Sequence, residues 1–301
     1  MLPPPGMCAP AEAPPEEMRH PVLVRTLDAG AEDVRDVRFS SDGARLAVGS
    51  NDARVRMFDV ASGRLLMQSE VTAGPIWNVA FALDDRRIVS FGPNDGAFGY
   101  HLWDPDSAEG ALTTDYEAIW NVAESGFPES RDQALRYERG VLYSRATGAV
   151  VAEIPGGNSP LTTAVFSYDG SALVVHNGQE MHVFNGRTGE PLSRLCGTLN
   201  GGTAVRTSAN GAYVATQEYG VANSPKVIAV WHVASGAIIA RIRAPYNSLE
   251  AQDISPNAEL LVTGSEDGRV RIWRLRSGPG PIPLIGPSLT RQNLEPRAPL
   301  A

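Results

Sequence analysis

The chain has 301 residues and a hydrophobic content of 43%, which is ample for a packed core. Its 30 Gly and 23 Pro, with few long apolar helical stretches, favour many short strands joined by turns. The net charge of −8 argues against a general nucleic-acid or anionic-membrane binder, because such proteins are usually basic. Because no run approaches the ~18 apolar residues needed to span a bilayer, we expect neither a nucleic-acid nor a membrane partner.

The first twenty residues, MLPPPGMCAPAEAPPEEMRH, are rich in Pro, Ala and Glu and lack the regions typical of a secretory signal. Their composition predicts a disordered tail over residues 1–21. The two cysteines, Cys8 and Cys196, lie far apart and indicate neither a disulfide framework nor a metal cluster. A reducing setting fits best, so we expect a cytoplasmic location and leave a nuclear one open.

Residues 22–278 repeat one pattern six times. Each unit has an alternating apolar segment, a polar turn such as SSDG, an apolar strand, an aromatic-bearing strand, a Ser/Thr-Gly turn and a last strand. The aromatic marker stands at Phe58, Trp103, Tyr143, Phe184, Trp231 and Trp273, at spacings of 45, 40, 41, 47 and 42 residues. Asp/Asn-Gly turns between alternating segments indicate hairpins. Four antiparallel strands in roughly 40–45 residues predict the blade of a β-propeller.

The first and last units contain closely related stretches, GSNDARVRMFDVASG (49–63) and GSEDGRVRIWRLRSG (264–278). Their S/T-G endings after an aromatic residue, the turn Asp and the S-x-D/N-G turns resemble the WD-repeat family of β-propellers. The chain departs from that family by lacking its Gly-His dipeptide and by keeping the Trp-Asp pair only at Trp103-Asp104. The resemblance covers 22–278 and implies an all-β, six-bladed propeller of four-stranded antiparallel blades.

Two parts of this ring need separate assignment. The third unit (119–154) is the weakest, and its second strand is predicted from DQALRYE (132–138). The segment VLVRTLD (22–28) is predicted to join the last blade, because an open ring would leave two sheet edges exposed. The rival for that place is PIPLIG (281–286), whose prolines suit only an edge strand. The Pro-rich residues 279–301 are predicted to be a mostly disordered tail.

No group of residues indicates catalysis. His176 and His182 flank a predicted hairpin turn, and zinc would need two more ligands that the sequence does not supply nearby. Carboxylate pairs fall in turns, where Asp usually bonds its own backbone, and nucleophile and phosphate-loop motifs are missing. We therefore expect no enzyme activity, no catalytic residues, no metal and no cofactor.

Arginines form alternating stripes on the third strands of the first and last units. These are Arg54, Arg56, Arg269, Arg271, Arg274 and Arg276. The stripe could contact phosphate, but the simpler interpretation is the polar face of half-buried strands, with long stems packed along the sheet.

The first strands give the one functional hint, because in WD-repeat propellers they are innermost and line the channel. Aligned on the Ser or Ala that ends each strand, the positions one and three before it are mostly apolar and should pack within and between blades. The residues five before it should lie near the channel mouth and are predicted to bind a partner: Arg35, Trp77, Trp120, Thr162, Thr203 and Glu250. IWNVA occurs at 76–80 and 119–123, so two Trp side chains would lie on neighbouring blades. Trp and Arg are enriched in binding hot spots, although the Trp rings could instead fill gaps between blades.

The predicted function is a non-catalytic scaffold that docks a peptide or a partner-protein loop on one face. One alternative is a structural subunit of a larger assembly that packs through the sides of the disc. The other, from a different class, is a propeller enzyme or small-ligand binder that uses the central channel, since a fold does not fix a function. Other proteins are therefore the expected partners.

Overall fold

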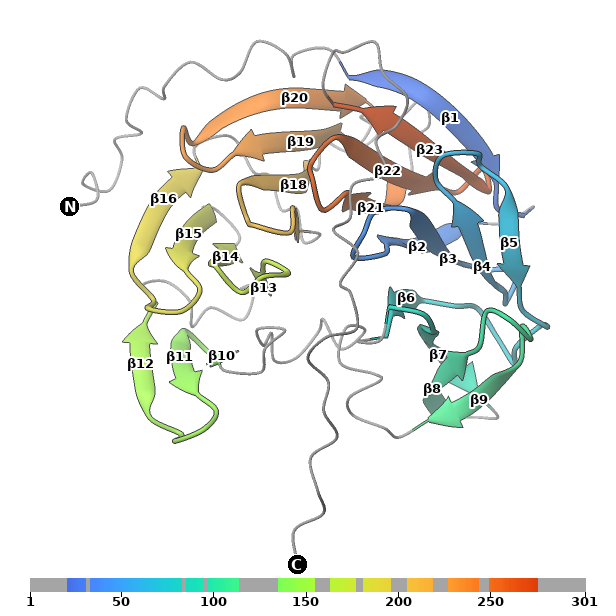
Figure 1. Cartoon of the computed structure of the whole chain (residues 1–301), viewed down its shortest axis with the longest axis horizontal. Helices are drawn as coiled ribbons and strands as arrows, with labels where there is room; N and C mark the ends of the chain where they lie inside the picture. The colour runs from blue at the N-terminus through green and yellow to red at the C-terminus, as the bar shows by residue number, and fades with distance from the viewer. Residues whose placement is uncertain are drawn as a thin grey trace, which may run out of the picture.

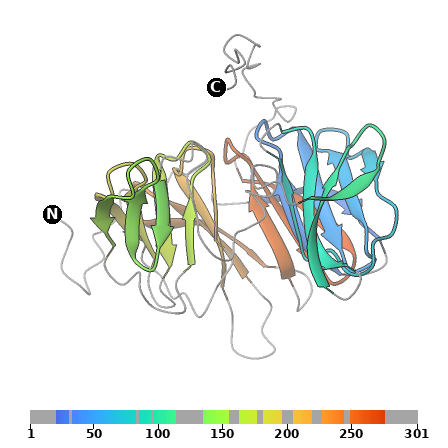
Figure 2. The ribbon, with the colours of Figure 1, turned by 90° about the horizontal axis from the view of Figure 1, so that it is seen from below.

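The computed structural model arranges the chain as six small antiparallel sheets in a ring (Figure 1). It describes residues 21–30, 33–82, 85–94, 97–113, 135–154, 163–176, 181–195, 205–218, 227–243 and 249–275. The strands run between the two faces of the ring, as the view turned by 90° shows (Figure 2). The predicted all-β, six-bladed propeller is confirmed.

The first three blades follow the chain in order. Blade 1 contains β2 (Val34–Phe39), β3 (Arg45–Ser50), β4 (Val55–Asp59) and β5 (Leu65–Gln68). Blade 2 contains β6 (Asn78–Phe81), β7 (Ile88–Asn94), β8 (Ala97–Trp103) and β9 (Gly110–Thr113). Blade 3 contains β10 (Leu135–Glu138), β11 (Val141–Ser144) and β12 (Val150–Glu153). Strand β10 confirms the second strand predicted in 132–138, while the predicted first strand of this unit lies outside the described residues.

The other three blades each have four described strands. Blade 4 contains β13 (Thr163–Phe166), β14 (Ala172–His176), β15 (Met181–Asn185) and β16 (Pro191–Leu195). Blade 5 contains β17 (Val205–Thr207), β18 (Tyr213–Glu218), β19 (Val227–His232) and β20 (Ala237–Arg243). Blade 6 contains β21 (Leu249–Ile254), β22 (Leu260–Ser265) and β23 (Arg269–Arg274), and its outer strand is β1 (Val22–Asp28).

The turn after each inner strand explains the repeated S-x-D/N-G sequence. The Ser40 hydroxyl donates to Asp42 Oδ1 at 2.6 Å and accepts the Arg45 N–H at 2.9 Å, so one side chain bridges both sides of the turn. Gly43 closes the turn at a φ of 72°, a region that favours Gly. In blade 6 the corresponding residue is Ala258, which takes a φ of 56° and is fully buried.

The hydrophobic core lies between the blades rather than at the ring centre. Clusters of buried side chains join blades 6 and 1, 1 and 2, 3 and 4, 4 and 5, and 5 and 6. On the face of blade 2 away from blade 1, the cluster around Ala80 and Val89 contains described residues of blade 2 alone. Each blade is therefore stabilised mainly by its neighbours, as in other repeat architectures.

The N-terminal strand closes the ring. β1 pairs antiparallel with β23 from Val22↔Arg274 to Asp28↔Arg269, and the Ala29 N–H continues the ladder to Gly268 O at 2.9 Å. This confirms the predicted closure by 22–28, and the rival segment 281–286 lies outside the described residues. The tails predicted at 1–21 and 279–301 stay predictions.

Closure places the first and last units, which share a sequence, side by side. Blades 1 and 6 are neighbours, and each places an Asp in the turn before its third strand and an Arg four residues later. The Asp52 and Arg56 side chains form an ion pair, and so do Asp267 and Arg271. The repeated D-x-x-x-R therefore fixes the same turn twice on adjacent blades.

We predict that Leu27→Ala will destabilise the protein much more than Leu23→Ala. Leu27 is 5% exposed and packs between blades 6 and 1, whereas Leu23 on the same strand is 45% exposed. Removing a buried Leu side chain costs about 2–5 kcal/mol, and an exposed one usually less than about 1 kcal/mol. Denaturant unfolding of both variants measures this, and equal losses would show that β1 does not hold the ring closed in solution.

Candidate functional site

The inner strands β2, β6, β13, β17 and β21 give the ring two distinct mouths. Each is the first strand of its blade in chain order, so their first residues surround one mouth and their last residues the other. We call these the N-terminal mouth and the C-terminal mouth. Figure 1 shows β2, β6, β13 and β21 nearest the centre of the ring. Of the residues predicted to bind a partner, Arg35, Trp77 and the backbone of Glu250 lie at the N-terminal mouth.

Trp77 stands at the N-terminal mouth, immediately before β6. Its backbone N–H donates to Phe91 O at 2.9 Å, and the N–H of the preceding Ile76 donates to Ser50 O on blade 1 at 3.0 Å. Ile76 is buried between the two blades, while the Trp77 side chain remains 39% exposed. The backbone of this loop is therefore fixed by both blades, and the indole is presented to solvent.

Trp77 belongs to an aromatic cluster with Phe91, Phe98 and Tyr100. Ring centroids lie 5.0 Å apart for Trp77 and Phe98 and 6.1 Å apart for Trp77 and Phe91. Phe91 is 4.8 Å from Tyr100, with which it pairs across β7 and β8. Phe98 is 62% exposed, so the outer part of this cluster faces water. The three residues around Trp77 were not predicted from the sequence. Phe98 and Tyr100 could have been found from their spacing of two residues on the aromatic-bearing strand that ends at Trp103.

Arg35 occupies a bulge in β2, between the paired residues Val34 and Asp36. Its Nε donates to Asn51 Oδ1 at 2.7 Å, and its guanidinium is 3.8 Å from the Asp33 carboxylate. The side chain is 38% exposed. The structure thus brings Arg35, on β2, and Trp77, immediately before β6, to the same mouth.

The other predicted partner-binding residues are less fully placed. The backbone of Glu250 lies at the corresponding bulge of β21, between Leu249 and Ala251. Trp120, Thr162 and Thr203 lie outside the described residues. The ring of six therefore stays a prediction, and the second Trp is not placed beside the first.

The apolar positions of the inner strands pack between blades as predicted. Buried examples are Val37, Phe39, Val79, Phe81 and Ala164. The residues that alternate with these apolar positions along each inner strand were not predicted to be functional. Polar residues at such alternate positions are usual on half-buried strands. In the described inner strands of blades 1, 5 and 6, these alternate positions carry charged side chains.

Two of these charged residues join neighbouring blades. Asp36 Oδ2 accepts the Val79 N–H of blade 2 at 3.0 Å, and Asp253 Oδ2 accepts the Phe39 N–H of blade 1 at 2.8 Å. An inner strand is the edge of its sheet, so its backbone N–H groups on the channel side have no neighbouring strand. These groups need other hydrogen-bond partners. The carboxylates supply them across the junctions of blades 6, 1 and 2.

Two arginines lie beside these carboxylates. Arg38 Nη1 donates to Asp36 Oδ1 at 2.8 Å, and Arg206 Nη2 is 3.8 Å from the same oxygen. Their side chains are 10% and 14% exposed. Burial raises the pKa of Asp253 to about 6, although the charges of Arg38 and Arg206 oppose this rise.

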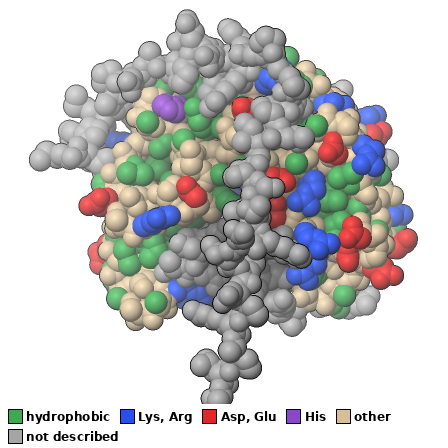
Figure 3. Space-filling view, in the orientation of Figure 1, with side chains coloured by type: hydrophobic (Ala, Val, Ile, Leu, Met, Phe, Trp, Pro, Cys, Tyr) green, Lys and Arg blue, Asp and Glu red, His purple; other side chains and the backbone are tan. Residues whose placement is uncertain are grey.

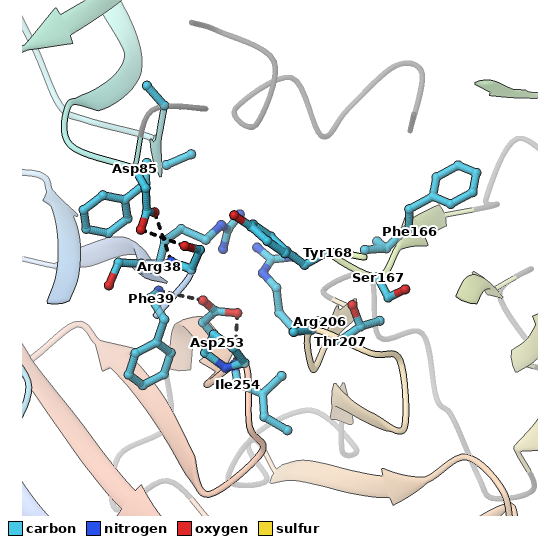
Figure 4. Close-up of a pocket in the computed structure, with 18 residues that line it drawn as sticks. Arg38, Phe39, Asp85, Phe166, Ser167, Tyr168, Arg206, Thr207, Asp253 and Ile254 are labelled. Carbon is cyan, nitrogen blue, oxygen red and sulfur yellow. Dashed lines mark hydrogen bonds between the residues drawn. The ribbon is translucent and has the colours of Figure 1, made fainter. Parts of the chain in front are cut away.

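A cavity of about 200 Å³ opens at the C-terminal mouth, where this charged group meets the ends of the inner strands (Figure 4). Phe39, Phe81 and Phe166 form apolar parts of its wall, and Tyr168, which is 40% exposed, stands at its rim. Pockets for drug-sized ligands usually hold 300–1,000 Å³. This cavity therefore has room for a side chain or a small fragment.

Four arginines of the two stripes are engaged within the protein, and Arg276 lies outside the described residues. Arg56 and Arg271 pair with turn aspartates, Arg54 Nη1 donates to Ser69 O at 2.6 Å, and Arg269 Nη1 donates to Asp28 Oδ2 at 3.0 Å. Basic and acidic side chains lie intermixed on the face drawn in Figure 3. These contacts favour the structural interpretation of the stripes over a phosphate-binding one.

In the part of the chain that the structure describes, no three His, Cys, Asp or Glu side chains gather to hold a metal ion. No helix among the described residues is long and apolar enough to cross a membrane. His176 and His182 lie on the paired strands β14 and β15, as predicted.

We predict that the wild type loses stability relative to Asp253→Asn as pH rises from 4 to 7.5. Burial raises the folded pKa of Asp253 to about 6, above the unfolded value near 3.8, so its stabilising contribution is complete below pH 4 and lost as pH rises through 6. The relative loss approaches about 3 kcal/mol, since one pKa unit corresponds to about 1.4 kcal/mol. Denaturant unfolding across this pH range measures the difference.

Asp59→Asn is the matched control. A side-chain hydrogen bond from Ser62 lowers the pKa of Asp59, so its contribution is lost only as pH falls below about 4. The difference between wild type and this variant should stay flat from pH 5 to 7.5. A flat profile for Asp253→Asn as well would contradict the assignment of a raised pKa to Asp253.

Comparison with family models matches both ends of the described propeller. A model of the anaphase-promoting complex subunit 4 WD40 domain matches residues 20–84, and a model of the WD domain, G-beta repeat, matches residues 239–274. These segments include the blades that meet at the ring closure.

Two curated relatives match most of this chain at low sequence identity. Autophagy-related protein 16 of Arabidopsis thaliana is 24% identical over 249 residues, which cover 80% of this chain and 47% of that protein. WD repeat-containing protein 1 of Xenopus tropicalis is 24% identical over 251 residues, which cover 78% of this chain and 39% of that protein. The chain thus spans less than half the length of these two relatives.

Among solved structures, the Cps50 (Swd1) β-propeller domain of Myceliophteria thermophila matches with a TM-score of 0.63 at 15% identity. The match covers 85% of this chain and 99% of that chain, and it shows the same fold. Together with the repeats, the blades and the family models, it supports one assignment. The chain is a β-propeller that carries WD40 repeats, and propellers of this kind typically serve as scaffolds for protein interactions and are generally non-catalytic.

Proposed function

We propose that this propeller is a non-catalytic scaffold that docks a peptide or a partner-protein loop at its N-terminal mouth. The observation that carries the proposal is the aromatic cluster, in which Trp77 is 39% exposed and Phe98 is 62% exposed. Large apolar rings gathered at the surface are costly to leave in water and are typical of interaction sites. Trp is also among the residues most enriched in binding hot spots.

The geometry of the cluster suits an anchor. The Trp77 backbone is held by hydrogen bonds, and Phe91 and Tyr100 support the rings from the paired strands β7 and β8. A rigid aromatic surface loses little conformational entropy when a partner binds. Arg35, on the neighbouring inner strand, adds an exposed guanidinium at the same mouth.

Several relatives support protein partners. The matched family model is named for a subunit of the anaphase-promoting complex, and other relatives are named as subunits of a translation initiation factor and of a guanine nucleotide-binding protein. These names describe those proteins. For this chain they favour membership of a multiprotein assembly as part of the proposal.

One observation favours a second mode, in which the sides of the disc pack against other subunits. The outer strands expose apolar side chains around the ring: Val22, Leu65, Leu112, Val150 and Leu192. Scattered exposed apolar residues are common on protein surfaces. The N-terminal mouth, where aromatic rings are gathered, is therefore the preferred docking site.

We predict that Trp77→Ala will abolish partner capture while Tyr168→Ala will not. The two aromatic side chains are nearly equally exposed, at 39% and 40%, but stand at opposite mouths. Affinity capture from host lysate, quantified by mass spectrometry, compares the wild type with both variants. A hot-spot Trp contributes enough binding energy for a loss of at least about tenfold.

The outcomes separate the possible sites. Partners lost only with Trp77→Ala support docking at the N-terminal mouth. Partners retained by both variants would contradict it and favour the sides of the disc. Partners lost only with Tyr168→Ala would move the site to the C-terminal mouth.

A further inference from the structure

We propose that the apolar segment PIPLIG (281–286) of this same chain docks in the cavity at the C-terminal mouth, with its aliphatic side chains against the aromatic groups there. This inference goes beyond the scaffold function proposed for the N-terminal mouth. It stands whether or not the aromatic cluster binds a partner.

The described part of the chain ends beside this cavity. The backbone N–H of Leu275, the residue after β23, donates to Glu259 O at 2.8 Å, and Leu275 is fully buried. Glu259 belongs to the connection between β21 and β22, and Pro256 on the same connection lines the cavity. Residues 276–301, which lie outside the described residues, therefore continue from a point fixed next to the cavity.

The segment is close enough to reach the cavity. Glu259 and Pro256 are three residues apart in the sequence, so their Cα atoms are separated by at most about 11 Å. Residues 276–280 span up to about 17 Å when extended. The segment 281–286 can therefore begin at the rim of the cavity while β23 keeps its place in blade 6.

The walls of the cavity suit aliphatic side chains. Val165 and Phe166 are half-buried in the wall, and Tyr168 at the rim is 40% exposed. Covering such apolar groups removes them from water, which is favourable. An apolar cavity of about 150 Å³ holds a benzene molecule. The cavity of about 200 Å³ therefore has room for the side chain of Ile282 or Leu284.

The charged groups of the cavity favour an uncharged occupant. Asp253 accepts two backbone N–H groups, at 2.8 and 2.9 Å. Arg38 and Arg206 lie beside the Asp36 carboxylate, at 2.8 and 3.8 Å. A charged ligand would have to displace one of these partners, at a cost in free energy. The segment PIPLIG carries no charge and leaves these contacts in place.

The closure of the ring leaves 281–286 available for this role. β1 holds the edge of β23, so the segment that was the rival for that place has no such edge to pair with. Its prolines lack N–H groups, which suits docking through side chains better than strand pairing. Residues 1–20 are the weaker candidate, because they join blade 6 at its outer strand, one strand farther from the channel than β23.

Photo-crosslinking in the full chain tests the proposal. The amino acid p-benzoylphenylalanine replaces Tyr168 at the C-terminal mouth or, as a control, Trp77 at the N-terminal mouth, which is nearly equally exposed at 39%. After irradiation and digestion with trypsin, mass spectrometry identifies the attached peptide. We expect the probe at position 168 to capture the peptide 277–291, which contains PIPLIG, and the probe at position 77 to capture at least about tenfold less of it.

Two variants of the tail test the aliphatic side chains. Ile282→Ser combined with Leu284→Ser removes the apolar contacts and should lower capture at position 168 by about fivefold or more. Leu294→Ser makes the same chemical change outside the segment and should alter capture less than about twofold. These residues follow blade 6 in the sequence, and thermal unfolding verifies that the propeller is intact in both variants.

A mixture of isotope-labelled and unlabelled chains separates capture within one chain from capture between two chains. Capture within one chain supports the proposal. Capture only between chains would overturn it and assign the cavity to a second copy. Capture of residues 1–20 in place of 277–291, absence of any captured peptide of this chain, or equal capture from positions 168 and 77 would also overturn it.

Discussion

The pairing of β1 with β23 is the interaction on which the rest of the ring depends. Each blade buries its apolar faces against the blades on either side, so a blade at an open end would leave one face and one edge exposed to water. The β1 strand removes both defects at once, because it completes the ladder of blade 6 and places Leu27 against blade 1. The inner strands can then surround a channel whose two mouths have fixed positions.

Charged side chains on the inner strands take over where the apolar packing between blades ends. Inner strands are sheet edges, and their backbone N–H groups face a space that no further strand fills. Asp36 and Asp253 satisfy such groups on the next blade, and the two arginines balance the buried carboxylates. Buried charge is tolerated there because every carboxylate has donors close by. The same arrangement that joins blades 6, 1 and 2 also leaves a charged cavity at one mouth.

The sequence predicts the architecture well because the architecture is local and repeated. Aromatic markers near every 43 residues, polar turns and alternating strands each define one blade, and the outer-strand character of 22–28 indicates the closure. Trp77 could be assigned to a channel mouth for the same reason, since its place within a repeat is known. Its partners Phe91 and Phe98 require the pairing of two strands to be known, which a repeat count does not provide.

The charged residues of the channel could not be predicted at all. Phe39 and Asp253 are 214 residues apart, and their contact exists only in the closed ring. In the sequence, Arg38 and Asp253 are ordinary polar residues that alternate with apolar ones. Only the convergence of five inner strands reveals that they meet. The identity of a partner is less predictable still, since it depends on the surface of another molecule.

The order in which the closing strands leave the ribosome has a consequence for folding. Of the described strands, β1 is synthesised before the others and β23 after them, and the two are joined by contacts such as that of Asp28 with Arg269, 241 residues apart. Blades 1 to 5 can form while synthesis continues, but the sheet of blade 6 has to wait for both of its ends. Long-range pairing of this kind slows folding and leaves edges exposed in the meantime. The unfinished ring is therefore the state in which the propeller is most prone to aggregate.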